Sequence, residues 1–124
     1  MKFFAKAFNE RDLDGMASVL APDATAQVLG APFPEEVGAA AIRETSFPHI
    51  CGAELDLAAS WFQTESSNYI LLREDQGRGP IDTVLDCTFV GPGVIERIEY
   101  LVAPHMPQRL AAFGRRCGLP TVAD

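Results

Sequence analysis

Residues 81–103 read IDTVLDCTFVGPGVIERIEYLVA, which is two runs rich in β-favouring residues on either side of a Gly-Pro-Gly turn. Gly91 and Gly93 tolerate positive φ, and Pro92 has a fixed φ, so the three residues suit a tight connection between strands. The stretch therefore predicts a β-hairpin. We expect the rest of the chain to cover this hairpin.

The first strand of the hairpin has apolar residues on both faces. Strict alternation gives two sets, one with Asp82, Val84, Asp86, Thr88 and Val90, the other with Thr83, Leu85, Cys87 and Phe89. Such a sheet must be covered twice, by helices on one face and by a partner subunit on the other. A carboxylate in this strand is costly to bury, so we expect Asp86 to be paired, protonated or at the edge of a cavity.

Composition narrows the class of protein. With 124 residues, 48% of them hydrophobic, the chain predicts a single domain over residues 1–124. A net charge of -7 argues against nucleic acid or an anionic membrane as a partner. Three cysteines without a CxxC pair, and two histidines, predict a reducing cytoplasmic setting and no structural metal site. We also expect no membrane span and no secretion signal.

The chain in order predicts helices, then strands, then a last helix. Periodicity and turn residues indicate helices over 2–9, 13–20, 35–45 and 108–117, and strands over 24–29, 54–64 and 68–75 before the hairpin. Asp12 is expected to cap the second helix, and residues 46–52 to form an irregular connection. Residues 104–124 are expected to be a helical extension of the same domain.

Several side chains have two interpretations. Phe4 and Phe8 share one helical face, which indicates core packing or the wall of a pocket. His49 is either a loop histidine or a group over a pocket, and Trp61 suits the core or an interface. Arg73 could neutralise Asp86, which would make that aspartate a member of an ion pair and not an acid.

Particular words of the sequence resemble the NTF2-like superfamily, which includes SnoaL-like polyketide cyclases and ketosteroid isomerases. These words are FNERDLDGMASVLAPDATAQVLG at 8–30, GAAAIRE at 38–44 and the final hairpin, so the resemblance covers about residues 3–103. It implies an α+β cone, in which a curved, mostly antiparallel sheet wraps round the N-terminal helices. The C-terminal helix is extra to that core, and the fold by itself says little about chemistry.

A comparison with the ketosteroid isomerases gives one match and two failures. The resemblance places Asp86 where that family keeps a neutral aspartic acid that donates a hydrogen bond to the developing oxyanion. The family's oxyanion-hole tyrosine falls on Phe4 and its general base on Val28, and neither side chain can transfer a proton. Tyr100 is expected to point inward beside Asp86 and could supply the missing phenol.

These observations predict a dimeric protein that binds a small, largely apolar molecule in the cone and needs no cofactor. The expected wall is Phe4, Phe8, Val28, Trp61, Leu71, Val84 and Tyr100, with Asp86 and Arg73 as polar contacts. One hypothesis is an isomerase, cyclase or dehydratase with Asp86 as acid, Tyr100 assisting and His49 as base. The others are a non-catalytic ligand binder and a protein-association module. An outer face of Leu85, Phe89 and Leu101 predicts the homodimer.

Overall fold

The computed structural model describes residues 2–52 and 56–124 of the chain. Its helices are α1 (Lys2–Asn9), α2 (Leu13–Ala17), α3 (Ala39–Glu44), α4 (Ser46–Cys51), α5 (Glu74–Gly77) and α6 (Pro107–Cys117). Its strands are β1 (Leu20–Val28), β2 (Glu36–Val37), β3 (Ala58–Gln63), β4 (Asn68–Arg73), β5 (Ile81–Phe89) and β6 (Ile95–Val102). None of these helices has the length and apolar character that crossing a bilayer requires.

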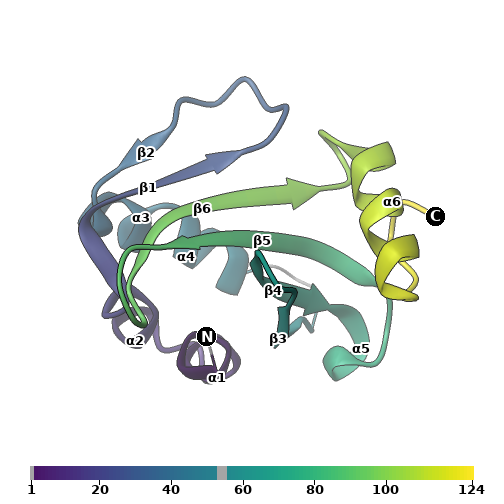
Figure 1. Ribbon diagram of the computed structural model, residues 1–124, viewed down its shortest axis with the longest axis horizontal. Helices are drawn as coiled ribbons and strands as arrows, with labels where there is room; N and C mark the ends of the chain where they lie inside the picture. Colours follow the sequence, from purple (N-terminus) through teal and green to yellow (C-terminus); the bar gives the residue numbers. More distant parts are fainter. Residues whose placement is uncertain (1, 53–55) are drawn as a thin grey trace.

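All six strands belong to one curved sheet. Their order is β2-β1-β6-β5-β4-β3, and every neighbouring pair is antiparallel except the parallel pair β1 and β6. The predicted hairpin forms β5 and β6, with Leu85 opposite Tyr100 and Thr83 opposite Val102. Figure 1 shows β1, β6 and β5 running side by side, with α6 at the end where β6 finishes. The predicted α+β class and mostly antiparallel sheet are confirmed.

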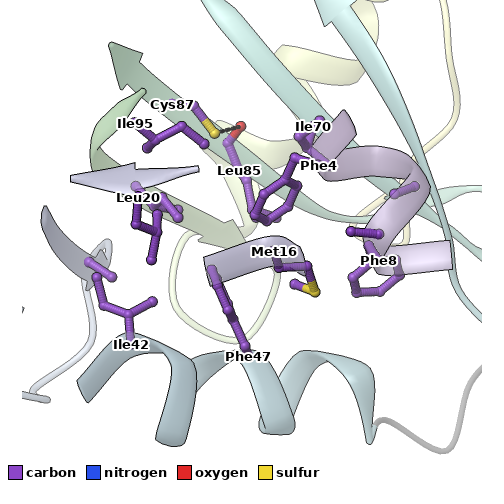
Figure 2. Packing of buried hydrophobic residues seen from close by; sticks show 14 of the residues in the cluster. Phe4, Phe8, Met16, Leu20, Ile42, Phe47, Ile70, Leu85, Cys87 and Ile95 are labelled. Carbon is purple, nitrogen blue, oxygen red and sulfur yellow. Dashed lines mark hydrogen bonds between the residues drawn. The ribbon is translucent and has the colours of Figure 1, made fainter. Parts of the chain in front are cut away.

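The main core lies between the sheet and helices α1 to α4. Phe4 and Phe8 of α1 are at most 1% exposed, and they pack with Met16, Phe47 and Leu85. Figure 2 shows Phe4, Met16 and Leu85 pointing toward one another. The rings of Phe4 and Phe47 meet edge to face, with centroids 5.6 Å apart. The aromatic face of α1 is therefore part of the core.

The opposite face of the sheet is covered by α6. Leu110 and Phe113 of this helix pack on Leu71, Val84 and Leu101 of the strands. Pro107 lies in the first turn, where its missing N–H is not needed, and Gly118 ends the helix in the left-handed conformation at φ 72. The predicted C-terminal helix is confirmed, and it occupies the face that the sequence left for a partner subunit.

Several predicted elements have different boundaries in the structure, among them β1, which begins at Leu20, and β4, which ends at Arg73. The helix expected over 13–20 ends at Ala17, although Asp12 caps it as expected through the Gly15 N–H at 2.9 Å. The helix expected over 35–45 begins only at Ala39, because Gly38 at φ 101 turns the chain after β2. Of the strand expected over 54–64, the structure has β3 from Ala58, and residues 54 and 55 lie outside the described part.

The segment expected to be irregular over 46–52 contains helix α4. Pro48 is the third helical residue, where a proline is tolerated because the first N–H groups have no partner inside the helix. This helix carries Ser46, Phe47 and His49. It therefore places two polar side chains of a predicted loop on a fixed element beside the sheet.

Candidate functional site

A cavity of about 760 Å³ lies between the inner face of the sheet and α4. This volume is within the range of about 300 to 1,000 Å³ that is typical of small-molecule sites. The wall combines β1, α4, β4, β5, β6, the loop before β2 and the turn after β6. The lining residues are Ala26, Gln27, Val28, Phe33, Pro34, Glu35, Glu36, Thr45, Ser46, His49, Ile50, Leu57, Leu72, Asp82, Thr83, Tyr100, Val102, Ala103, Pro104, His105 and Val122.

The deep part of the cavity is apolar. Ala26, Leu57 and Leu72 are buried, whereas Phe33 and Val122 are exposed and belong to the rim. The ring of Phe33 meets His105 edge to face, with centroids 5.7 Å apart, so the loop after β1 touches the turn after β6 at this rim. The apolar interior suits a molecule that is itself largely apolar.

Tyr100 supplies a buried hydroxyl to this interior. The residue is 3% exposed, and its Oη lies 2.8 Å from Ser46 Oγ, the first residue of α4. Burial raises the pKa of Tyr100 well above its ordinary value, the Ser46 hydrogen bond opposes this shift, and the Glu36 carboxylate adds to it. Tyr100 is therefore a neutral phenol at physiological pH, and the two hydroxyls form a pair that can donate one further hydrogen bond.

Asp82 reaches the cavity because β5 contains a bulge. Leu72 pairs with Thr83 and the next residue, Arg73, pairs with Ile81, so Asp82 is an extra residue without a partner on β4. Ile81 packs in the outer cluster under α6, while Thr83 lines the cavity. The bulge thus changes the face of the sheet to which the side chain of Asp82 points, and this is the cavity side. Its Oδ1 accepts a hydrogen bond from Thr83 Oγ1 at 2.7 Å.

The C-terminal segment fixes the backbone next to this bulge. The Ile81 N–H donates to the Pro120 carbonyl at 2.9 Å, and the Val122 N–H donates to the Ile81 carbonyl at 3.0 Å. Val122 itself lines the cavity, and Thr121 packs against Gly114 of α6. The extension after β6 therefore contributes to the cavity wall and anchors the residue that precedes Asp82.

Both histidines of the chain line the cavity. His49 is exposed on α4, and His105 is half-buried in the turn after β6. No group of three or more His, Cys, Asp or Glu side chains suited to hold a metal ion occurs within residues 2–52 and 56–124.

No family model and no curated protein matches the sequence. Solved structures do match the fold. A protein with a cystatin-like fold from Silicibacter pomeroyi is 12% identical with a TM-score of 0.65, over 93% of this chain and 79% of that one. An NTF-2 like protein of unknown function from Burkholderia xenovorans is 12% identical with a TM-score of 0.61, over 80% and 76%. A steroid delta-isomerase from Pseudomonas aeruginosa is 21% identical with a TM-score of 0.59, over 91% and 85%.

The protein has the NTF2-like fold. The fold that the sequence words implied is therefore confirmed. At identities of 12 to 21% the likeness covers the architecture and does not extend to the activity of any neighbour.

The NTF2-like sheet places Asp86 on the wrong face for the predicted role. Asp86 lies opposite Tyr69 and Glu99, on the face that carries Val84 and is covered by α6, and it does not line the cavity. Tyr100 points to the other face. The predicted pairing of Asp86 with Tyr100 as acid and phenol is therefore wrong, because neighbouring residues of paired strands alternate between faces and the two belong to different sets.

The environment of Asp86 is that of a partly buried surface group. Burial raises the pKa of its carboxyl, the neighbouring Glu99 raises it further, and Arg109 and Arg97 lower it. Arg73 is not among these groups. Its guanidinium donates to the Gly79 carbonyl at 2.8 Å, so the predicted pair of Arg73 with Asp86 is wrong.

Other predicted wall residues also lie outside the cavity. Leu71 and Val84 pack under α6, and Phe4 and Phe8 fill the core. Trp61 is 37% exposed, with Lys2 Nζ 6.0 Å from its ring centroid. Val28, His49 and Tyr100 are the predicted site residues that the NTF2-like fold brings together at the cavity.

The three residues expected to form an apolar dimer surface do not lie on one exposed face. Leu85 and Phe89 pack in the inner core, and Leu101 is covered by α6. The expectation treated three residues as one exposed face, but the sheet divides them between two layers. The homodimer itself stays a prediction.

Sequence reasoning missed Asp82, Thr83 and Ser46. Strict alternation places Asp82 and Asp86 on the same face, and no local sequence pattern indicates the bulge that separates them. The contact between Ser46 and Tyr100 joins residues 54 positions apart. A signal for Ser46 does exist, since helix α4 begins there and Pro48 fits its first turn.

Proposed function

We propose that the protein binds a small, largely apolar molecule in this cavity and holds its polar group with Tyr100 and Ser46. The observation that carries the proposal is the hydroxyl pair of buried Tyr100 and half-buried Ser46, 2.8 Å apart in the wall of a cavity of about 760 Å³. A buried polar group in an apolar wall specifies the orientation of a ligand, while the apolar area supplies most of the affinity.

The hydroxyl pair suits a ligand with a carbonyl or hydroxyl oxygen. One of the two hydroxyls donates to the other, and the second proton can go to a ligand oxygen or, when it is that of Ser46, to the Ile42 carbonyl at 3.4 Å. The raised pKa of Tyr100 keeps this donor neutral. The steroid delta-isomerase that shares the fold is named for an apolar substrate class of this kind, which supports the proposal without identifying the ligand here.

Fluorescence titration with the neutral apolar probe N-phenyl-1-naphthylamine tests the proposal. Val28→Trp fills the cavity from β1, and Val90→Trp is the matched control because Val90 is 49% exposed and does not line the cavity. We expect saturable binding that Val28→Trp weakens at least about tenfold, a cost of about 1.4 kcal/mol, and that Val90→Trp leaves unchanged. Equal effects of the two variants would contradict the site.

Acid–base catalysis of the isomerase, cyclase or dehydratase kind is a second candidate function. It is favoured by Asp82, a carboxylate that the bulge directs to the same cavity as Tyr100 and His49. In this version Asp82 takes a proton from carbon, and the Tyr100 phenol stabilises the oxyanion that develops. Asp86 has no part in it.

Deuterium exchange separates catalysis from binding. In D₂O, a catalytic protein exchanges the acidic C–H groups of the neutral ketone 2-tetralone faster than buffer does. Asp82→Asn should abolish this acceleration and Asp86→Asn, on the other face of the sheet, should retain it. If 2-tetralone binds but its exchange is not accelerated, the ligand-binding function is kept and the role of Asp82 as a catalytic base is excluded.

A further inference from the structure

We infer that the molecule bound in this cavity carries a positively charged nitrogen on its apolar frame. This inference rests on the proposed function, because it names the class of ligand for the same cavity. Three carboxylates, Glu35, Glu36 and Asp82, belong to the wall, while none of the ten lysines and arginines of the chain, all within the described ranges, does.

Among the residues that the structure describes, none of these three carboxylates belongs to an ion pair. The ion pairs among the described residues join Arg43 to Asp14, Arg78 to Asp75 and Arg97 to Glu99. None of them involves a carboxylate of the cavity wall. A ligand cation would be attracted to these carboxylates, and a ligand anion would be repelled by them on entering the cavity.

Asp82 is the carboxylate best placed to contact the nitrogen. It is half-buried, and the 2.7 Å hydrogen bond from Thr83 fixes one of its oxygens. Within the described part of the chain this is the one hydrogen bond to the carboxylate, so its other oxygen is left for a ligand N–H. A hydrogen bond from a charged ammonium to a carboxylate is stronger than one between neutral groups.

Glu36 extends the negative potential to the deep part of the cavity. It is half-buried, and its charge raises the pKa of Tyr100, which is 3% exposed. Its field therefore acts on the interior and not only on the rim. Glu35 is exposed, and we assign it a smaller effect because water screens it.

Three matched probes of one shape test the charge preference. They are 2-naphthylmethylamine, which is a cation, 2-naphthylmethanol, which is neutral, and 2-naphthoate, which is an anion. The affinities are measured by calorimetric titration at pH 8, where the amine probe is protonated and the acid probe is ionised. We expect the amine to bind about tenfold more tightly than the alcohol, and the alcohol more tightly than the acid, which corresponds to roughly 1.4 kcal/mol per step.

Asp82→Asn and Asp86→Asn form a matched pair of variants. Both remove one negative charge from β5, but Asp82 lines the cavity and Asp86 lies on the α6 face. Asp82→Asn should lower the preference for amine over alcohol about fivefold. Asp86→Asn should leave both affinities unchanged. Glu36→Gln is a second variant that should also lower the amine preference.

The outcomes distinguish the two proposals. If the amine binds no better than the alcohol, the charge inference is overturned, while binding of the alcohol keeps the proposed function. If none of the three probes binds, the proposed function fails and the charge inference fails with it. If Asp86→Asn lowers the amine preference as much as Asp82→Asn, the effect is one of net charge and the assignment to Asp82 is overturned.

Discussion

Asp82 and Asp86 are four residues apart on β5, yet their carboxyl groups belong to opposite faces of the sheet. Without the bulge, both would share a face, as strict alternation requires. The extra residue between Ile81 and Thr83 separates them. One aspartate therefore belongs to a cavity and the other to the surface beside α6.

Asp86→Asn is expected to stabilise the protein at pH 7. Burial first, and then Glu99, raise the pKa of Asp86 in the folded chain, so the folded state binds this proton more tightly than the unfolded state. Stability therefore falls as pH rises from the ordinary value of about 3.9 through the raised one. The asparagine variant removes this loss, and like charges at 86 and 99 no longer face each other.

Denaturant unfolding at pH 7 and pH 3.5 measures this effect. The gain from Asp86→Asn should be present at pH 7 and be smaller at pH 3.5, where aspartate is largely protonated in both states. Glu96→Gln, an exposed residue of β6, is the control for a change in net charge. A variant that is less stable than the wild type at pH 7 would contradict the environment described for Asp86.

Tyr100→Phe should destabilise the protein at pH 8, and this difference in stability should largely disappear at pH 11. At pH 8 the variant loses the Ser46 hydrogen bond, at a cost of about 1 kcal/mol. At pH 11 the unfolded wild type gains about 1 kcal/mol by ionising a tyrosine of ordinary pKa, which the buried Tyr100 cannot match. Tyr69→Phe, which removes the other tyrosine hydroxyl, is the control. Parallel stability profiles of Tyr100→Phe and the wild type would contradict the burial of this phenol.

Gly114→Ala should weaken both stability and ligand binding. In a helix interior alanine is normally favoured over glycine by about 1 kcal/mol. Here a Cβ would overlap the Thr121 methyl and lie 2.7 Å from the Leu119 carbonyl oxygen, so it would displace the segment that anchors Ile81. We expect a loss of about 1 to 3 kcal/mol and weaker binding of N-phenyl-1-naphthylamine.

A control on the same helix separates the two effects of Gly114→Ala. Ala112→Gly should cost about 1 kcal/mol in stability through helix propensity alone and leave the affinity for the probe unchanged. If Gly114→Ala is as stable as the wild type, or loses stability without any loss of affinity, the C-terminal segment does not support the cavity wall.

Asn9→Ala should cost about 1 to 3 kcal/mol, because it leaves two backbone groups of an edge strand without partners. The Asn9 amide donates to the Ala59 carbonyl at 3.0 Å, and its oxygen accepts from the Ala59 N–H at 2.7 Å. Asn9→Asp keeps the acceptor and should lose less. Denaturant unfolding together with exchange of the Ala59 amide measures the effect. Unchanged protection of that amide in Asn9→Ala would contradict the bridge between α1 and β3.

The predicted homodimer is tested by light scattering at micromolar concentration. A dimer gives twice the 13.4 kDa of one chain. A single-chain mass would refute the prediction, and the structure already shows that α6 covers Leu101, on which that prediction partly relied.

The hairpin and the fold were readable from the sequence because their signals are local. Gly91, Pro92 and Gly93 mark the turn, and the runs on either side have the β-favouring composition of paired strands. The inward direction of Tyr100 was also predicted, through the resemblance to the ketosteroid isomerases, and the residue is buried. Local pattern and global fold agree at these positions.

The cavity could not be predicted from the sequence, because it depends on a strand irregularity and on contacts between residues far apart in the chain. A single extra residue in β5 reverses the facing of Asp82, and helix α4 brings Ser46 to Tyr100 across 54 positions. The covering of Leu71 and Val84 by α6 is likewise a tertiary arrangement. The sequence contains the acidic and hydroxyl side chains of the site, but the strand register determines to which face of the sheet each of them points.

A crystal structure of the protein with 2-naphthylmethanol tests the central claim most directly. We expect the naphthalene ring to lie between Val28 and Leu72, with the ligand hydroxyl within hydrogen-bond distance of Tyr100 Oη or Ser46 Oγ. An empty cavity at ten times the dissociation constant measured in solution, or a ligand bound on the α6 face beside Asp86, would contradict it.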